Sequence, residues 1–260
     1  MHMDRRQFVK NLGLGTASLS MGSLVTASSC APSGDSSLKQ NVKEGEDGQF
    51  LFIGDDIAIA QTEYGKVQGY LLNHVYTFLG VPYGADTSGK NRFMPPQKPE
   101  PWADVRPAVF YGNTAPQRME NRWPNNYGTF ADHWNYWDVS EDCLYLNVWT
   151  PGIADGKKRP VLVWLHGGGF TNGSGIEQDG YHGENISREG DIVFCSINHR
   201  LGPIGFSDLS GVGGEAYKDS GNVGMLDIIA ALRWVHDNIA NFGGDPGNVT
   251  VMGQSGGGSK

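Results

Sequence analysis

A serine near the end of the sequence stands in a pattern that favours nucleophilic chemistry. Ser255 lies in the run Gly-Gln-Ser-Gly-Gly at residues 253–257, directly after the apolar run at 249–252. Small residues two before and two after a serine let a strand and a helix approach closely around a sharp turn that exposes the hydroxyl. The spacing predicts a nucleophile elbow with Ser255 as the attacking group. Such a pattern also arises by chance in glycine-rich chains, so its context must support it.

A second glycine-rich stretch, His-Gly-Gly-Gly-Phe at residues 166–170, follows another apolar run. Attack on a carbonyl puts negative charge on one oxygen, and fixed backbone N–H groups about 3 Å away stabilise that charge. We expect Gly168 and Gly169 to supply two donors and Gly256, next to the serine, the third. The alternative is a phosphate-binding turn, but neither G-x-x-x-x-G-K-S/T nor G-x-G-x-x-G follows it.

The elements that must position these residues are strands and one long helix. Apolar runs bounded by turn residues predict buried strands at residues 144–149, 161–165, 192–197 and 249–252. Three- and four-residue steps predict an amphipathic helix whose inward face holds Met225, Leu226, Ile229, Leu232, Val235, His236 and Ile239. Strand, helix and strand with a tight terminal turn predict the α/β fold class with a mostly parallel central sheet.

The region before these strands has a different pattern. Short apolar runs between turn residues at 57–81 predict small antiparallel strands and hairpins. Residues 92–136 are dense in Pro, Asn and aromatic residues without a clear period, which predicts long surface loops.

Five ordered stretches give the sequence a family resemblance: FLGVPY at 78–83, RF at 92–93, SEDCLYLNV at 140–148, HGGGF at 166–170 and NFGGDP at 241–246. From about Ile57 to its end the chain resembles the type-B carboxylesterases, the cholinesterase-like family. This resemblance implies an α/β-hydrolase fold, hydrolysis of carboxylic esters, and no metal or organic cofactor. It also implies that Arg92 and Glu141 form an ion pair, and that Trp134 corresponds to an aromatic wall of the substrate gorge. Simple packing of Trp134 against the domain is the alternative.

The sequence departs from the family at its catalytic triad. The fold orders its triad as serine, acid and histidine, whereas all seven histidines here precede Ser255. We therefore expect a fold truncated after the nucleophile elbow, with the nucleophile strand as an unpaired edge, and an isolated fragment without esterase activity. His166 is expected to orient the glycine loop and not to serve as the base. The alternatives to an esterase are a non-catalytic cholinesterase-like binding or adhesion protein and a truncated pseudoenzyme.

Other departures concern single residues. Gln254 stands where the family commonly has glutamate, which removes a negative charge beside the nucleophile and any expected preference for cationic substrates. The family often bridges the cysteine matching Cys143 to a partner upstream, but no cysteine lies near Ala115. Cys143 is expected to be an unpaired buried thiol, and Cys195, within a predicted strand, to pack in the core.

The N-terminus resembles an export signal. Arg5 and Arg6 precede a weakly apolar stretch at 12–27, as in twin-arginine signals, and the stretch is too short and polar to span a membrane stably. We expect a signal at 1–29, a flexible linker at 30–50 and the hydrolase domain at 51–260. Cleavage before Cys30 would allow its lipidation, whereas cleavage after Ala27 would not require it. We expect an exported protein that is periplasmic or extracellular and is attached to a membrane only through Cys30.

The composition of the chain argues against nucleic acid and metal ions as its partners. The 260 residues carry a formal net charge of -8 with a pI near 5.3, which makes nucleic-acid binding an unfavourable prediction. Three scattered cysteines and histidines without ligand spacing predict neither a disulfide scaffold nor a metal site. A small-molecule ester is the expected partner.

Overall fold

The computed structural model describes residues 50–118 and 138–260. The expectations for the export signal, for lipidation of Cys30 and for Trp134 fall on residues 1–49 and 119–137 and lie outside the described residues. All of the described residues belong to one compact unit, Lys43–Lys260.

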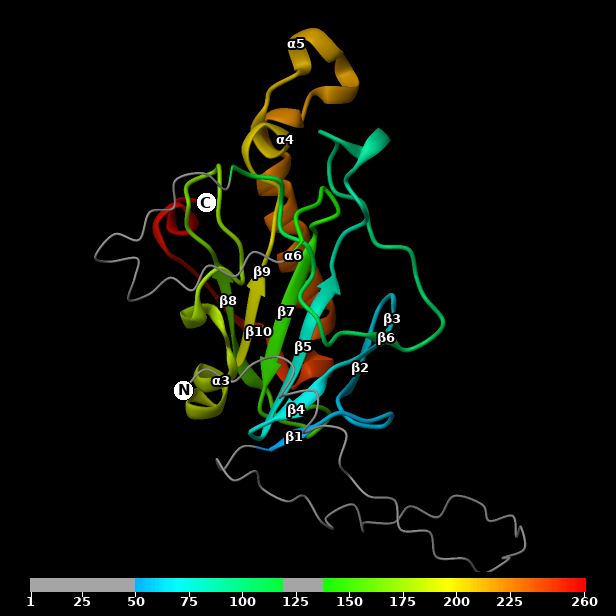
Figure 1. The fold of residues 1–260 in the computed structure, drawn as a ribbon, viewed down its shortest axis with the longest axis vertical. Coiled ribbons are helices and arrows are strands. Elements are labelled where there is room, and N and C mark those ends of the chain that lie inside the picture. The colour runs from blue at the N-terminus through cyan, green and yellow to red at the C-terminus, as the bar shows by residue number, and fades with distance from the viewer. Residues whose placement is uncertain (1–49, 119–137) are drawn as a thin grey trace, which may run out of the picture. The chain divides into compact units, whose positions relative to one another are not determined.

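A mixed sheet of seven strands organises the described part of the chain (Figure 1). Its order is β1-β4-β5-β7-β9-β8-β10, and a smaller sheet has the order β2-β3-β6. The strands are β1 (Leu51–Phe52), β2 (Ile59–Thr62), β3 (Gly65–Gln68), β4 (Tyr70–Leu72), β5 (Val75–Pro82), β6 (Arg106–Pro107), β7 (Tyr145–Thr150), β8 (Arg159–Leu165), β9 (Val193–Ile197) and β10 (Gly244–Gly253). The predicted strands and the small antiparallel hairpins before residue 81 are confirmed.

Connection length explains the strand directions. The link between β7 and β8 spans only residues 151–158, which is too short for a parallel crossover, and β7 runs antiparallel to β9. Helix α3 (Glu184–Gly190) connects β8 to β9, and α6 (Val223–Asn238) lies between β9 and β10. Strands β9 and β10 are accordingly both parallel to β8. The parallel part of the sheet is thus the part that carries the glycine loop and the serine.

The remaining helices are short and lie between the larger elements. They are η1 (Gly89–Asn91), η2 (Asp179–Tyr181), α4 (Gly202–Phe206), α5 (Ser210–Gly213), η3 (Glu215–Tyr217), η4 (Ser220–Asn222), η5 (Ile239–Phe242) and η6 (Ser255–Ser259). Among the residues that the structure describes, none of the helices has the length and apolar content that a bilayer crossing requires.

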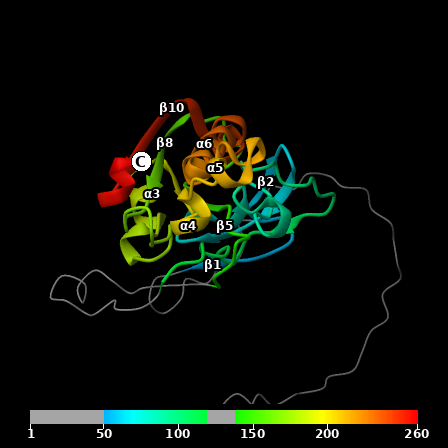
Figure 2. The ribbon, with the colours of Figure 1, turned by 90° about the horizontal axis from the view of Figure 1, so that it is seen from above.

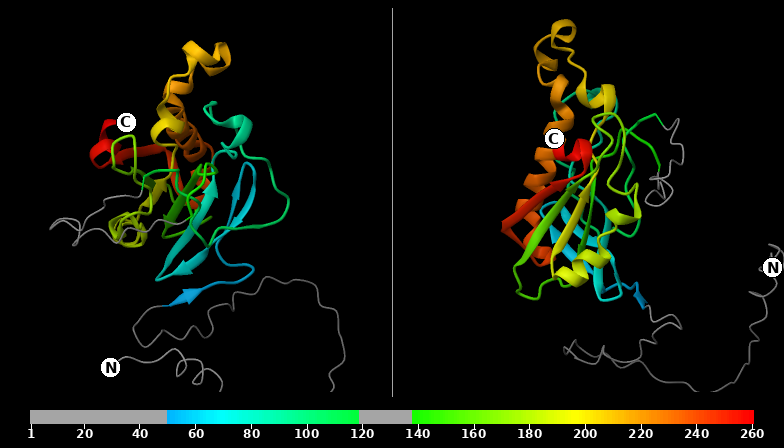
Figure 3. Two further views of the ribbon diagram at one scale, coloured as in Figure 1. Left: turned by 45° about the horizontal axis from the view of Figure 1, so that its top comes forward. Right: turned by 90° about the vertical axis from the view of Figure 1, so that its left-hand side faces the viewer.

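Helices cover both faces of the sheet, with α6 on one side and α3 on the other (Figures 2 and 3). Trp234 of α6 packs in a core with alternate side chains of β7, β8 and β9, such as Cys195. Phe194 points to the other face, where it packs with Trp149, and the Ser187 hydroxyl of α3 donates to the Trp149 carbonyl at 3.1 Å. Burial on both faces explains why these strands are continuous apolar runs.

The inward face of α6 differs from the predicted one. Asp227 is fully buried, whereas Ile229 is 42% exposed and His236 is also exposed. The helix is rotated relative to the apolar pattern because the Asp227 carboxylate pairs with Arg200 inside the protein. The expectation that Ile229 and His236 face the sheet was therefore wrong, although the helix itself is confirmed.

Strand β10 places the serine relative to the glycine loop. Five consecutive residues of β10 pair in parallel with β8, from Val249 opposite Val161 to Gly253 opposite Leu165. The register shifts between Gly244 and Val249, where β10 contains more residues than β8. Within the described residues β10 pairs with β8 alone, and its Val251 is 47% exposed. The strand delivers residue 253 beside residue 165, where the glycine loop begins.

Three side-chain expectations from the sequence are confirmed. The Arg92 guanidinium donates to both carboxylate oxygens of Glu141 at 2.7 Å, and this bond raises the pKa of Arg92. Cys143 and Cys195 are buried free thiols. Burial raises the pKa of each thiol, so both remain protonated and pack as small apolar groups.

Candidate active site

The turn that carries Ser255 has the geometry of a nucleophile elbow. Ser255 has a φ of +52°, an unusual backbone conformation for a residue with a side chain, and it is exposed. A Cβ on Gly253 would collide with the backbone of Gly257, and one on Gly257 would collide with the carbonyl of Leu165. The turn is closed by a 2.9 Å bond from the Gly257 N–H to the Gln254 carbonyl. Small residues at 253 and 257 are therefore required by close backbone packing.

The glycine loop lies directly against the elbow. A Cβ on Gly256 would lie within 2.6 Å of the Gly169 oxygen, so the two backbones are in direct contact. Gly168 and Gly169 have φ values of +84° and +63°. In the ranges 50–118 and 138–260, no hydrogen bond uses the N–H of Gly168 or Gly169 as donor. The structure thus brings together the three predicted donor residues beside Ser255.

Neighbouring backbone holds the loop in this shape. The Asn172 N–H donates to the Gly168 carbonyl at 3.2 Å, and the Gly202 N–H donates to the Phe170 carbonyl at 2.7 Å. The Gln117 side chain accepts from the Gly173 N–H at 2.8 Å. These bonds occupy the carbonyls of the loop, whereas the N–H groups of Gly168 and Gly169 donate to no described residue and are available to a ligand oxygen, as an oxyanion hole requires.

Two buried histidines lie beneath the loop. His166 places Nδ1 2.8 Å from the Gly167 carbonyl, and its ring stacks on that of His199 with centroids 4.9 Å apart and an interplanar angle of 14°. His199 places Nδ1 2.9 Å from the Arg200 carbonyl. Burial lowers the pKa of His199 well below its ordinary value, so the ring is neutral. His166 thus contacts the loop it was expected to orient.

Lys260 completes this cluster, and the sequence reasoning missed both it and His199. The Lys260 ammonium lies 3.1 Å from Nε2 of His199 and 5.7 Å from the centre of the Phe170 ring. Burial lowers the pKa of Lys260 to about 8. Its signal in the sequence is a lysine five residues after the predicted nucleophile, at the end of the short helix η6.

The described residues supply the serine and the donors but not a proton relay. No described side chain accepts a hydrogen bond from Ser255 Oγ. Within the same residues, no cluster of three or more His, Cys, Asp or Glu side chains is placed to hold a metal ion. The arrangement described can present a hydroxyl to a carbonyl and stabilise the resulting oxyanion.

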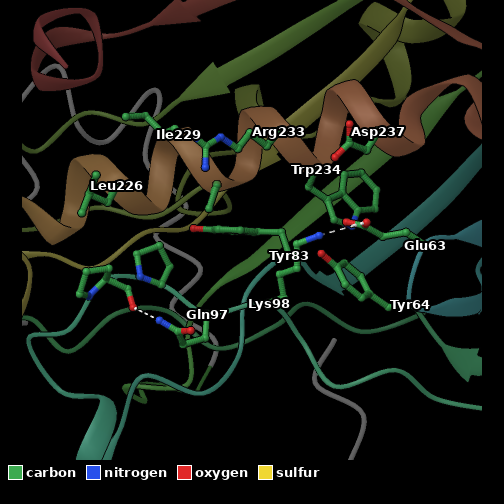
Figure 4. Close-up of a pocket in the computed structure, with 13 residues that line it drawn as sticks. Glu63, Tyr64, Tyr83, Gln97, Lys98, Leu226, Ile229, Arg233, Trp234 and Asp237 are labelled. Atoms are coloured by element: carbon green, nitrogen blue, oxygen red, sulfur yellow. Dashed lines mark hydrogen bonds and ion pairs between the residues drawn. The ribbon is translucent and has the colours of Figure 1, made fainter.

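A separate hollow of about 350 Å³ lies against α6 (Figure 4). Tyr83, Lys98, Arg233 and Trp234 are among the residues that line it, and Lys98 pairs with Glu63 at 3.5 Å. None of its lining residues belongs to the elbow or to the glycine loop. The hollow is therefore distinct from the candidate active site.

A parallel strand that ends in a tight turn at a serine, beside a glycine loop on the neighbouring strand, defines the α/β-hydrolase class. A model described as the carboxylesterase family matches residues 56–260, and the chain belongs to that family. The resemblance seen in the sequence is thereby confirmed.

Similar proteins include both enzymes and solved structures. The chain is 44% identical to the para-nitrobenzyl esterase of Bacillus subtilis (strain 168), over 77% of this chain and 38% of the relative. It is 40% identical to the acetylcholinesterase of Electrophorus electricus, over 80% of this chain and 34% of the relative. An esterase from Clostridium hathewayi that can hydrolyse aliphatic aromatic polyesters has a TM-score of 0.73 and 45% identity, over 79% of this chain and 40% of that chain. The chain thus spans about two fifths or less of these proteins.

Proposed function

We propose that the protein is a serine carboxylic ester hydrolase that works through an acyl-enzyme. The observation that carries this proposal is the strained, exposed Ser255 next to Gly256, whose backbone touches Gly169 of the glycine loop. Membership of the carboxylesterase family supports the same reaction class. Retention of the serine and of the full glycine loop favours an enzyme over a non-catalytic binding or adhesion protein.

The proposed reaction has two stages. Ser255 Oγ bonds to the ester carbonyl carbon as a histidine takes the hydroxyl proton, and the oxyanion accepts hydrogen bonds from Gly168, Gly169 and Gly256. The adduct collapses with cleavage of the bond to the alcohol oxygen, which receives the proton from the histidine. Water then attacks the acyl-enzyme by the same route and releases the acid.

The histidine and its acidic partner are proposed to follow Ser255 in the chain, in the order that the fold uses. None of the seven histidines of residues 1–260 follows the serine, and His166 and His199 are both fully buried. We accordingly propose that residues 1–260 by themselves have negligible turnover, since loss of the triad histidine from a comparable enzyme costs about 10⁶ in kcat.

Small-molecule carboxylic esters are the proposed substrates.

We also propose that the cell exports the protein by means of the paired arginines Arg5 and Arg6. Lipidation at Cys30 is the proposed means of membrane attachment. Fractionation of cells, with and without an Arg5→Lys and Arg6→Lys double substitution, tests the export route. An unchanged exported fraction would reject it.

Hydrolysis of p-nitrophenyl butyrate by the protein expressed from its complete gene tests the activity. Ser255→Ala should abolish turnover and labelling by a fluorophosphonate, whereas Ser259→Ala, the matched change of an exposed serine four residues away, should preserve both. Full turnover in Ser255→Ala would refute the serine mechanism, and absence of both turnover and labelling in the unaltered protein would favour the binding role.

A further inference from the structure

Lys260 connects the helix of the nucleophile to the glycine loop by two separate contacts. Its ammonium lies 3.1 Å from Nε2 of His199, and 5.7 Å from the centre of the Phe170 ring. Phe170 directly follows Gly169 and packs edge-on against Phe206, with centroids 4.9 Å apart. The same cation therefore touches the loop itself and a residue beneath it.

The hydrogen-bond partners fix which atoms donate. The Arg200 carbonyl can only accept, so Nδ1 of His199 carries the proton and Nε2 has the free electron pair. Nε2 therefore accepts a hydrogen bond from the Lys260 ammonium. The His199 ring in turn stacks on His166, whose Nδ1 lies 2.8 Å from the Gly167 carbonyl. An uninterrupted series of contacts runs from η6 to the first residues of the glycine loop.

We propose that Lys260 is a positioning residue whose ammonium, through His199 and Phe170, holds the glycine loop in register with the nucleophile elbow. This inference rests on the proposed function of Ser255, because its effect on catalysis is to keep the N–H groups of Gly168 and Gly169 aimed where the oxyanion forms. Such donors act on the transition state more than on the bound ester. Lys260 therefore contributes to kcat and leaves KM nearly unchanged.

The charge of Lys260 gives the loop a pH dependence. The titratable groups that act on Lys260 are His199 and Glu177, and His166 acts in turn on His199. His199 is neutral, and burial lowers the pKa of Lys260 to about 8 while Glu177 raises it. As the pH rises through this value the ammonium loses its proton, which removes the attraction to the Phe170 ring and weakens the bond to His199. Turnover falls on the alkaline side for this reason.

Substitutions in the protein expressed from its complete gene test the proposal. Lys260→Met should lower kcat about tenfold with KM within about twofold, since a charge-assisted hydrogen bond is lost. Lys260→Arg keeps a permanent cation and should retain kcat while moving the alkaline limb up by more than about one pH unit. The control is Lys218→Met, an exposed lysine paired with Glu215, which should match the unaltered enzyme. An unchanged kcat and an unchanged alkaline limb in Lys260→Met would overturn the proposal.

A second measurement does not depend on activity. Amide hydrogen exchange at Gly168, Gly169 and Phe170 should be at least about fivefold faster in Lys260→Met than in Lys260→Arg, because the loop opens when its tie is lost. Equal exchange rates in the two variants would reject the positioning role even in a protein that hydrolyses esters. If exchange is faster in Lys260→Met but the unaltered protein hydrolyses no ester, the positioning contact of Lys260 stands and only the proposed serine esterase function is rejected.

Discussion

The Arg200 guanidinium donates to both carboxylate oxygens of Asp227, at 2.9 Å from Nε and 2.6 Å from Nη2, with both side chains buried. The Arg200 N–H donates to the same carboxylate at 3.0 Å, and Nη1 donates to the Met94 carbonyl at 2.8 Å. The pair joins α6 to the segment after β9 that also carries His199. Burial acts to raise the pKa of Asp227, and the Arg200 bonds oppose that rise.

Removal of one partner from this pair should be costly. Asp227→Asn leaves a buried guanidinium without its counter-charge, and we expect the free energy of unfolding to fall by about 3–5 kcal/mol. Urea denaturation followed by tryptophan fluorescence measures it. Asp237→Asn, an exposed aspartate on the same helix, is the control and should change the free energy by less than about 1 kcal/mol. Similar losses in the two variants would contradict the role given to the buried pair.

Two adjacent glycines of the loop should respond differently to alanine. Gly168 has a positive φ, and an added Cβ would collide with the Asn172 carbonyl, so Gly168→Ala must move the loop. Gly169 also has a positive φ, but its Cβ would meet nothing within 4 Å, which leaves only backbone strain of about 1–2 kcal/mol.

We expect kcat/KM to fall at least about 100-fold in Gly168→Ala, as for loss of an oxyanion donor. In Gly169→Ala the expected fall is less than about 20-fold. Steady-state kinetics on a chromogenic ester, with the protein expressed from its complete gene, compares them. Equal losses in the two variants would contradict the idea that the collision at residue 168 lowers activity by moving the loop.

Acid should remove part of the stability that Arg159 provides. Its guanidinium donates to Asp155 at 2.6 Å and to Asp191 at 2.8 Å, and these bonds lower the pKa of both carboxyl groups. A carboxyl group whose pKa is lowered in the folded state adds stability at pH values above its unfolded pKa of about 3.9. That stability is lost as the pH falls through the folded-state pKa.

Arg159→Met should therefore lower the free energy of unfolding by about 2 kcal/mol at pH 7. The exposed Asp191 contributes little to this value, because solvent screens its attraction to the guanidinium. Part of this difference should disappear near pH 3, and the rest should persist because the Gly152 carbonyl also loses a donor. Denaturant titrations at both pH values measure the change, with Lys157→Met as the control of an exposed pair. A larger difference at pH 3 than at pH 7 would have the wrong sign.

A charge placed beside the nucleophile should alter substrate preference. The Gln254 side chain lies against Gly167, where an added Cβ would collide with its Oε1. Gln254→Glu should raise kcat/KM for a choline ester about threefold relative to its uncharged 3,3-dimethylbutyl analogue, because the attraction acts through solvent. The ratio should fall back as salt is added. An unchanged ratio at low salt would show that the substrate cation does not approach residue 254.

The parts of the fold and site that local patterns encode were predictable from the sequence. The tight turn at Ser255 and the glycines at 253 and 257 express a steric rule about close backbone approach, and such rules operate within a few residues. The buried strands were equally readable, because strands covered on both faces are continuous apolar runs.

Other features depend on partners distant in the chain. The rotation of α6 follows from Asp227 and an arginine 27 residues earlier, so the apolar pattern of the helix did not contain it. Lys260 and His199 are 61 residues apart, and neither stands in a motif that refers to the other. Their contact exists because β9 and β10 flank β8 and both run parallel to it, so that the carboxyl ends of the two strands lie at the same end of the sheet.

The irregular pairing of β10 with β8 has a consequence for where this chain tolerates a change in length. One residue of β8 lies between Arg159 and Val161, and four residues of β10, 245–248, lie between their partners Gly244 and Val249. The surplus is accommodated before the regular pairing begins, so a change in chain length at residues 247–248, after the NFGGDP stretch, would leave that pairing in place. Gly253 would keep its place opposite Leu165, because the five paired residues Val249–Gly253 follow the irregular segment, and Ser255 would keep its place two residues later.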